Sequence, residues 1–209
     1  MTSPLLLVTE VPVDQEAIHE AVAAWQRWVT AADGSRSILY EGVETPTVLE
    51  LTPLTALSDL TVLTGRWRDL GRALAPLSTG DVRRQVLEFV DAPKPAADEL
   101  PDTPYVQLRH VEVKPPVHED YLAWRPGTIF AEVLKSERIE TFLAYHSLVS
   151  TDPGVMFVSG FSCEPDEYLP TFDSERYAEI ARQAHPRFVT DDGLYTRIYR
   201  RVSAGRSAA

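Results

Sequence analysis

The chain has 209 residues, enough for one large domain or for two compact domains of roughly 100 residues each. Its composition, with 44% hydrophobic and 24% charged residues, is that of a folded globular protein and excludes disorder for the bulk of the chain. The net charge of −11 counts against nucleic acid as a partner, because neutralising phosphates requires an excess of bases.

The cellular compartment is indicated by two features. The single cysteine, Cys163, excludes a disulfide framework and a multi-cysteine zinc site, and fits a reducing compartment. The first apolar run, at residues 5–8, is too short for a signal peptide or a membrane span, and no basic segment precedes it. We therefore expect a cytoplasmic protein with no membrane partner.

The first half of the chain predicts the element order βαββαβ. A helix is expected after Asp14, a candidate N-cap, and Gly34 ends it. Pro53 opens a second helical region, in which Trp67 and Leu70 follow helical spacing. The expected strands are residues 5–11, 37–42, 47–51 and 82–90.

The second half of the chain repeats this order after a proline-rich stretch. A helix is expected from about Ser174 to His185, and a hairpin turn at residues 151–154. The expected strands are residues 105–114, 142–150, 154–162 and 193–202. We therefore predict an N-terminal unit at 1–92, a linker at 93–103, a C-terminal unit at 104–203 and a flexible tail at 204–209.

Each βαββαβ unit predicts an antiparallel four-stranded sheet with both helices on one face. Neither face of the last strand is simply polar, since Leu194 and Ile198 alternate with Tyr195 and Tyr199. The face without helices must therefore be covered as well. The economical arrangement packs the two sheets of the chain against each other as an intramolecular pseudo-dimer.

Residues 4–91 resemble the antibiotic-biosynthesis monooxygenase type of dimeric α/β barrel. The stretches that carry the resemblance are Tyr40-Glu41-Gly42, Leu49-Glu50-Leu51, Trp67-Arg68-Asp69-Leu70, Leu74-Ala75-Pro76-Leu77 and Leu87-Glu88-Phe89-Val90. The resemblance implies an α+β fold in which tandem ferredoxin-like units form an intramolecular α/β barrel, as a monomeric pseudo-dimer or a homodimer. Many family members hold a small aromatic substrate between the sheet and helices of one unit. The superfamily also includes polyketide cyclases, heme-degrading and heme-dependent enzymes and stress-response proteins, so the fold does not name a reaction.

Motifs for nucleotide cofactors and metals are missing from the sequence. The chain contains no glycine-rich phosphate loop and no Gly-x-Ser-x-Gly motif. His110 and His118 lie eight residues apart with no other histidine or cysteine at ligand spacing nearby. We therefore expect no cofactor and no metal site.

The second half departs from the simplest form of its fold in the connection after its first strand. Residues 118–125 read as a helix, which Pro126-Gly127 interrupts before a new helical stretch begins. Such departures are enriched at functional sites. Trp124 is thus a candidate pocket wall and Arg125 a candidate anion clamp, the alternative being a kinked helix with a buried tryptophan and a solvated arginine.

Two histidines fall on apolar strand faces. His146 shares the face of Ala144 and Leu148, and His110 shares the face of Leu108. A histidine in such surroundings could act as a general base on an acidic phenol or enol. The alternative for each is a buried, hydrogen-bonded structural histidine.

These features favour a cofactor-free enzyme that oxygenates or cyclises a small aromatic, polyketide-like molecule of secondary metabolism. A histidine would remove a proton to give a carbanion reactive towards O2 or an internal carbonyl. The predicted cavity is lined by the catalytic candidates His146 and His110 and by Tyr145, Phe157 and Tyr199, with Trp124 and Arg125 at its rim.

Two other functions stay open. A heme-dependent enzyme would need an axial histidine, for which His185 is the candidate. The simpler role of His185 is a favourable interaction with the end of its helix. A non-catalytic protein would bind an apolar or aromatic molecule in the same cavity without turnover.

Overall fold

The structure is a computed structural model, and it describes residues 2–31 and 36–203, without the side chains of residues 30, 31 and 191–193. The expected helix end at Gly34 and the tail at 204–209 lie outside the described residues. The first half comprises β1 (Leu5–Pro12), α1 (Ile18–Ala31), β2 (Ile38–Gly42), β3 (Thr47–Leu54), α2 (Asp59–Leu74) and β4 (Arg83–Lys94).

The second half follows the same plan with additional short helices. Its strands are β5 (Tyr105–Val113), β6 (Thr141–Val149), β7 (Val155–Phe161) and β8 (Val189–Arg201). Its helices are α3 (His118–Trp124), α4 (Ile129–Lys135), α5 (Pro165–Tyr168) and α6 (Glu175–Arg187), with 3-10 turns η1 (Pro115–Val117), η2 (Arg125–Gly127) and η3 (Leu169–Phe172).

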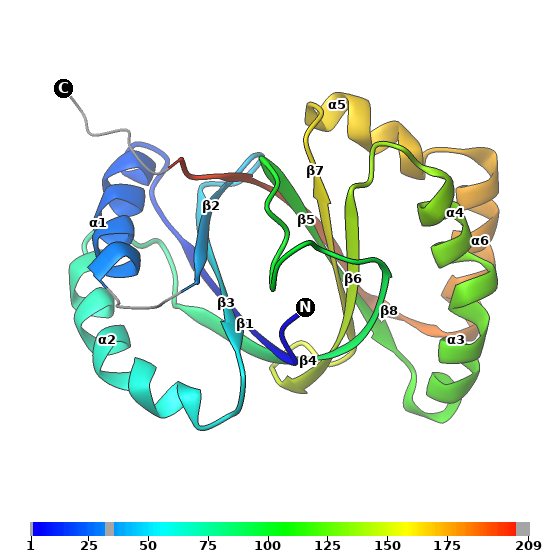
Figure 1. Cartoon of the computed structure of the whole chain (residues 1–209), viewed down its shortest axis with the longest axis horizontal. Coiled ribbons are helices and arrows are strands. Elements are labelled where there is room, and N and C mark those ends of the chain that lie inside the picture. Colours follow the sequence, from blue (N-terminus) through cyan, green and yellow to red (C-terminus); the bar gives the residue numbers. More distant parts are fainter. Residues whose placement is uncertain (1, 32–35, 204–209) are drawn as a thin grey trace.

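The eight strands form a closed antiparallel barrel in the order β1-β3-β2-β8-β5-β7-β6-β4. Helices α1 and α2 cover one end of the elongated molecule, and α3, α4 and α6 cover the other (Figure 1). This arrangement confirms the predicted α+β fold with an intramolecular barrel.

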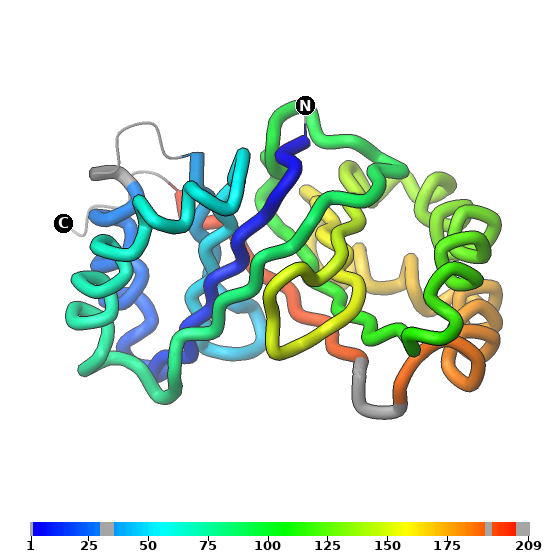
Figure 2. The backbone as a smooth tube through the Cα atoms, turned by 90° about the horizontal axis from the view of Figure 1, so that it is seen from below, coloured from blue at the N-terminus to red at the C-terminus, as the bar shows by residue number. Residues whose placement is uncertain are grey.

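The two sheets are joined more closely than the sequence led us to expect. Instead of only packing face to face, they also pair at both edges, β2 with β8 and β4 with β6. Figure 2 shows β1 beside β4, with the β6–β7 hairpin next to them. The hydrogen-bonded sheet is therefore continuous across the two halves of the chain.

Strand alternation divides the core into layers. Tyr145 on β6 faces the barrel lumen, whereas its neighbour His146 faces α3, where its ring contacts His118. The lumen is filled by buried side chains from both halves, among them Leu6, Val8, Tyr40, Leu49, Val106, Leu108, Val158 and Tyr199. The layer between the second sheet and its helices is aromatic-rich, with Tyr121, Phe130, Phe142, Phe157, Phe161, Tyr168 and Phe188.

The interrupted helix of the second half is confirmed, as α3, the η2 turn and α4. The hairpin is confirmed as well, with Gly154 at φ 125° in the turn, where a side chain would collide with the backbone of β5. The prediction for Pro53 was wrong, because Pro53 lies within β3, paired with Leu6. The second helix begins only at Asp59, whose carboxylate accepts hydrogen bonds from the backbone of the preceding turn.

Candidate functional site

An apolar cavity lies in the second half, between strands β5, β7 and β8 and helices α3, α4 and α6. It encloses about 90 Å³, and the empty space including its solvent-open mouth is about 530 Å³. The enclosed part is smaller than an ordinary small-molecule pocket, so a ligand of drug size has to occupy the open mouth as well. The lining includes Arg109, Tyr121, Phe157, Tyr177, Ile180 and His185.

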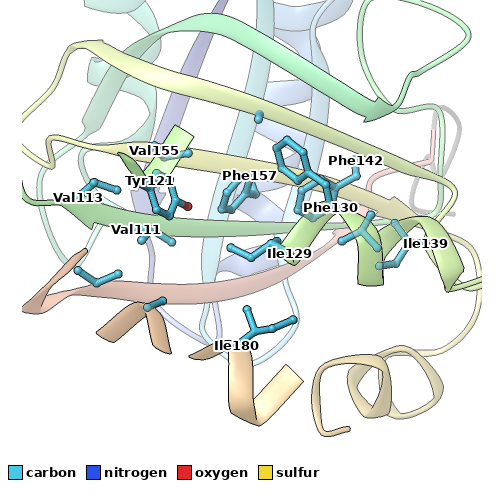
Figure 3. Close-up of a cluster of buried hydrophobic side chains, with 14 of the residues drawn as sticks. Val111, Val113, Tyr121, Ile129, Phe130, Ile139, Phe142, Val155, Phe157 and Ile180 are labelled. Atoms are coloured by element: carbon cyan, nitrogen blue, oxygen red, sulfur yellow. The ribbon is translucent and has the colours of Figure 1, made fainter. Parts of the chain in front are cut away.

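The interrupted helix places part of this lining. Because the chain turns at η2, α3 and α4 approach the sheet separately, and each inserts its own side chains (Figure 3). Tyr121 comes from α3 and Ile129 from α4, and both are buried in the cluster that surrounds Phe157. Thr128 stabilises the turn by donating its hydroxyl to the carbonyl of Trp124 at 2.9 Å. The proline and glycine thus shape the cavity wall.

Arg109 brings a positive charge into the apolar lining. It lies on β5, and its guanidinium is 5.7 Å from the ring centre of Tyr177. Among the described residues no carboxylate forms an ion pair with it, and its charge acts on the hydroxyls of Tyr121 and Tyr177. Burial raises the pKa of both tyrosines, so the two hydroxyls remain neutral donors at physiological pH.

Arg125 is a second cation without an acid beside it. It is only 3% exposed, and its Nε and Nη1 atoms have no hydrogen-bond partner among the described residues. The guanidinium lies 4.9 Å from the ring centre of Phe130. Burial lowers the pKa of Arg125, and the charges of Tyr121 and Asp91 oppose this shift.

The hydroxyl of Tyr121 links the two arginines. The residue is 1% exposed, and the hydroxyl has no partner among the described residues. Burial raises its pKa, opposed first by the charge of Arg125 and more weakly by that of Arg109. The hydroxyl therefore lies in the positive field of both guanidinium groups, at the cavity lining.

His146 lies on the helix-facing side of β6, beyond the cavity. Its ring is 4.8 Å from that of His118, at an interplanar angle of 68°. Burial lowers the pKa of His146, and the charges of His118 and Arg125 lower it further. Along the sheet, His146 pairs with Val155, which pairs with Val111 of the cavity lining. The histidine is therefore two strand spacings, about 10 Å, from the cavity.

The structure does not bring all the predicted site residues together. Phe157 and His185 line the cavity, and Arg125 and His146 lie beyond Tyr121 on the same side of the sheet. Trp124 packs against Phe188, with ring centres 5.1 Å apart, and does not belong to the cavity lining.

The prediction that His110, Tyr145 and Tyr199 share a cavity with His146 was wrong. All three face the barrel lumen, because successive residues of a strand point to opposite faces. His110 stacks on Tyr195 at 4.9 Å.

The lumen residues also contact other parts of the barrel, although Nδ1 of His110 and the Tyr145 hydroxyl have no hydrogen-bond partner among the described residues. His110 bonds to the carbonyl oxygen of Pro153 at 2.9 Å through Nε2. The Tyr199 hydroxyl donates to the carboxylate of Glu10, and Tyr145 packs edge-on against Phe89. The two predicted histidines are therefore separated by the sheet itself.

The sequence analysis missed Arg109, Tyr121 and Tyr177. Arg109 could have been found, because it interrupts an otherwise buried strand on the same face as Tyr105 and Val111. Tyr121 and Tyr177 gave no separate signal, since an aromatic residue at helical spacing is usually a core residue.

The equivalent layer of the first half is closed. Thr9 on β1 occupies the place that Arg109 has on β5, and it is flanked by Glu50 and Arg84. The Trp25 indole donates to Glu50 at 2.9 Å, and Arg66 pairs with the same carboxylate at 2.8 Å. A polar cluster built around Glu50 thus fills the position that is open in the second half, although Nε of Arg66 and Nε of Arg84 have no hydrogen-bond partner among the described residues.

The residues around His185 do not fit a heme. The side chain of His185 is exposed at the cavity mouth, and the space beneath it is occupied by Phe157, Tyr177 and Ile180. The enclosed 90 Å³ cannot admit a porphyrin without displacing these side chains. Among residues 2–31 and 36–203, no group of three His, Cys, Asp or Glu side chains is placed to hold a metal ion. Within the same residues, no helix is long and apolar enough to cross a membrane.

Comparison with known proteins identifies the fold. No protein-family model matches the sequence, and no curated protein matches it either. An anthrone oxidase-like protein of known structure superposes with a TM-score of 0.74 at 16% identity, covering 95% of this chain and 91% of that one.

Two structures from Listeria monocytogenes extend the similarity. A ferredoxin-fold protein related to antibiotic biosynthesis monooxygenases gives a TM-score of 0.56 at 5% identity, covering 97% of each chain. A heme-degrading enzyme gives 0.54 at 6% identity, covering 94% of this chain and 98% of that one. The chain therefore has the fold of the monooxygenase-like α/β barrels, which confirms the resemblance seen in the sequence at the level of fold. At these identities the similarity defines the fold alone.

Proposed function

We propose that the protein is a cofactor-free oxygenase or cyclase that acts on a small aromatic, polyketide-like molecule. The observation that carries the proposal is the apolar cavity of the second half, which has Arg109 in its lining and Arg125 behind Tyr121, neither of them in an ion pair among the described residues. Such a site suits an aromatic ring system with an anionic oxygen. The anthrone oxidase-like structure, which shares the fold, supports an electron-rich polycyclic substrate.

In this proposal His146 is the general base. Its lowered pKa keeps the imidazole neutral at pH 7, so it can accept a proton. His146 lies outside the cavity lining, so the proposal requires the Tyr121 side chain to move aside for a ring system that enters beside Phe157. Arg125 would stabilise the carbanion or phenolate that deprotonation produces.

The oxygenase reaction balances without a cofactor. His146 removes a proton from an activated methylene, and the carbanion adds O2 to form a peroxide anion. The proton returns from His146 to this anion, and the hydroperoxide loses water to leave a ketone. One O2 is consumed, and one of its atoms leaves as water. In the cyclase form, the same carbanion attacks a carbonyl carbon of the substrate.

The first prediction is that His146→Ala lowers turnover of anthrone by at least about 100-fold, since a general base contributes about 10²–10⁴-fold. The measurement is O2 uptake together with formation of the anthraquinone, with chelator present. The matched control is His19→Ala, because His19 lies exposed on α1 in the other half.

Two results would contradict the proposal. Full activity of His146→Ala would remove the histidine from the chemistry. Tight binding of anthrone without O2 uptake or a cyclised product would favour a non-catalytic binding protein.

A further inference from the structure

Arg109 is the one permanent cation among the described residues that line the cavity of the second half. The same described lining contains no Asp or Glu side chain, although the chain as a whole carries 31 acids against 20 bases. Binding sites match the charge of their ligand, so a positive wall without acids disfavours a cationic ligand and favours an anionic one.

The guanidinium of Arg109 has no partner within the described part of the chain. No hydrogen bond or ion pair joins it to another described residue, and its contact is the ring of Tyr177, whose centre is 5.7 Å away. The side chain is half-buried, and its nitrogen atoms are not among the completely buried polar atoms. In this respect Arg109 differs from Arg125, whose Nε and Nη1 atoms are completely buried. A ligand in the cavity therefore meets Arg109 as part of the wall.

The sheet around Arg109 places no carboxylate beside it. Its cross-strand neighbours are Phe157 on β7 and Thr196 on β8. Gln107 and Val111 precede and follow it on the same face of β5. None of these four neighbours is acidic.

The helices over the cavity use acids elsewhere. Each of α3, α4 and α6 carries an acid that forms an ion pair outside the lining, namely Asp120 with Arg187, Glu132 with Lys135 and Glu179 with Arg182. Arg109 thus has no counter-charge among the described residues, and an anionic ligand atom would supply one in surroundings that are largely apolar.

Tyr177 on α6 adds a second hydrogen-bond donor to the same wall. Its side chain lines the cavity, and its hydroxyl forms no hydrogen bond with a described residue. Burial raises the pKa of this hydroxyl, so it remains protonated and able to donate. The guanidinium from β5 and the phenol from α6 therefore border one side of the cavity together.

We infer that Arg109, assisted by the Tyr177 hydroxyl, binds the anionic oxygen of an aromatic ligand, so that the cavity takes phenols in their ionised form. The ring then lies against Phe157 and Ile180, which line the cavity from the sheet and from α6 (Figure 3). The oxygen bound here is ionised before the reaction, whereas His146 removes its proton from a carbon of the substrate. The inference names the ionised form of the substrate and rests on the proposed function.

The test uses 4-nitrophenol, a one-ring probe whose anion absorbs visible light, and compares the pKa of the free and the bound probe by absorbance titration. The wild type should bind the phenolate at least about tenfold more tightly than the phenol, so the pKa of the bound probe should fall by at least about 1. Arg109→Met should bring this pKa back to the free value or above it, because an apolar cavity favours the neutral phenol. Arg109→Lys should keep part of the preference, because it retains the charge without the planar fork.

Two controls separate anion binding from the shape of the cavity. Nitrobenzene has the same ring without the hydroxyl, and its affinity in titration calorimetry should change less than about twofold in Arg109→Met. Arg182→Met removes one exposed positive charge from α6 outside the lining, and it should leave the pKa of bound 4-nitrophenol at the wild-type value.

Three results would overturn the inference: no binding of 4-nitrophenol to the wild type, a bound probe whose pKa is not lowered, or a lowering that survives Arg109→Met. None of these measurements depends on turnover. Loss of the lowered pKa with intact O2 uptake would therefore refute the anion site alone. A lowered pKa that depends on Arg109, without O2 uptake or a cyclised product, would refute the proposed reaction alone.

Discussion

The charge state of His146 depends on its neighbours. Burial is the largest cause of its lowered pKa, and the charge of His118 is the next. Glu88 and a hydrogen bond to the backbone of Ser147 act in the opposite direction, and Arg125 adds a small repulsion. The folded protein therefore favours the neutral imidazole, the form that a general base needs.

His118→Gln should raise the pKa of His146, because the substitution removes the side chain whose charge contributes to lowering that pKa. The pKa should stay below the ordinary 6.5, since burial remains. Activity of the wild type should fall as the pH falls through the lowered pKa, and this acidic limb should move to higher pH in His118→Gln. NMR titration of His146 and the pH profile of kcat/KM measure the two quantities. A limb that does not move would exclude His146 as the base.

The lowered pKa of His146 also makes the free energy of unfolding depend on pH. Between the ordinary pKa of 6.5 and the lowered value, the unfolded state binds more protons than the folded state. Stability contributed by this group is therefore complete above pH 6.5 and is lost as the pH falls towards the folded pKa. His118→Gln should make this acid loss smaller.

At the scale of elements, each helix pair covers its sheet in a different way. In the first half, α1 and α2 bring Trp25 and Arg66 onto Glu50, and the layer is closed by a buried ion pair with side-chain exposures of 12% and 4%. In the second half, the break at Pro126-Gly127 separates α3 from α4 and leaves a cavity beneath them. The interruption of this helix connection thus decides which half contains the cavity.

Glu50→Gln should destabilise the protein by about 3 kcal/mol, because it leaves the buried guanidinium of Arg66 without its counter-charge. The amide oxygen can still accept from Trp25, so the loss should be at the lower end of the range for buried pairs. Urea unfolding measures the change. Asp69→Asn breaks the exposed pair with Arg72 on α2 and should cost less than about 0.5 kcal/mol. Equal effects of the two substitutions would refute this account of the first half.

The element order and the interrupted helix could be predicted from the sequence, because alternation, turn residues and Pro126-Gly127 are local signals. The cavity lining could not, since it combines Arg109, Tyr121 and Tyr177 from three distant segments. The assignment of His110 failed for a related reason. Alternation shows that residues share a face within one strand, but it does not say whether that face meets the lumen or the helices.

At the scale of the molecule, barrel closure makes the two halves interdependent. The lumen core takes Leu6 and Leu49 from the first half and Leu108 and Val158 from the second. A polar contact crosses the same boundary, where Glu10 on β1 pairs with Arg197 of β8 at 2.9 Å. Either half alone would expose one complete apolar face of its sheet. The two halves therefore repeat the same architecture, but each half depends on the other to cover the apolar face of its sheet.

The protein should consequently unfold in a single transition, with equal calorimetric and van't Hoff enthalpies, although it contains two ferredoxin-like units. Leu49→Ala and Leu108→Ala each remove a fully buried lumen side chain, one from each half, and each should cost about 2–5 kcal/mol. Because the lumen is shared, both substitutions should lower the one Tm without splitting the transition. Differential scanning calorimetry of the three proteins makes the measurement. Two resolved transitions, with only one of them moved by each substitution, would show that the halves are independent folding units.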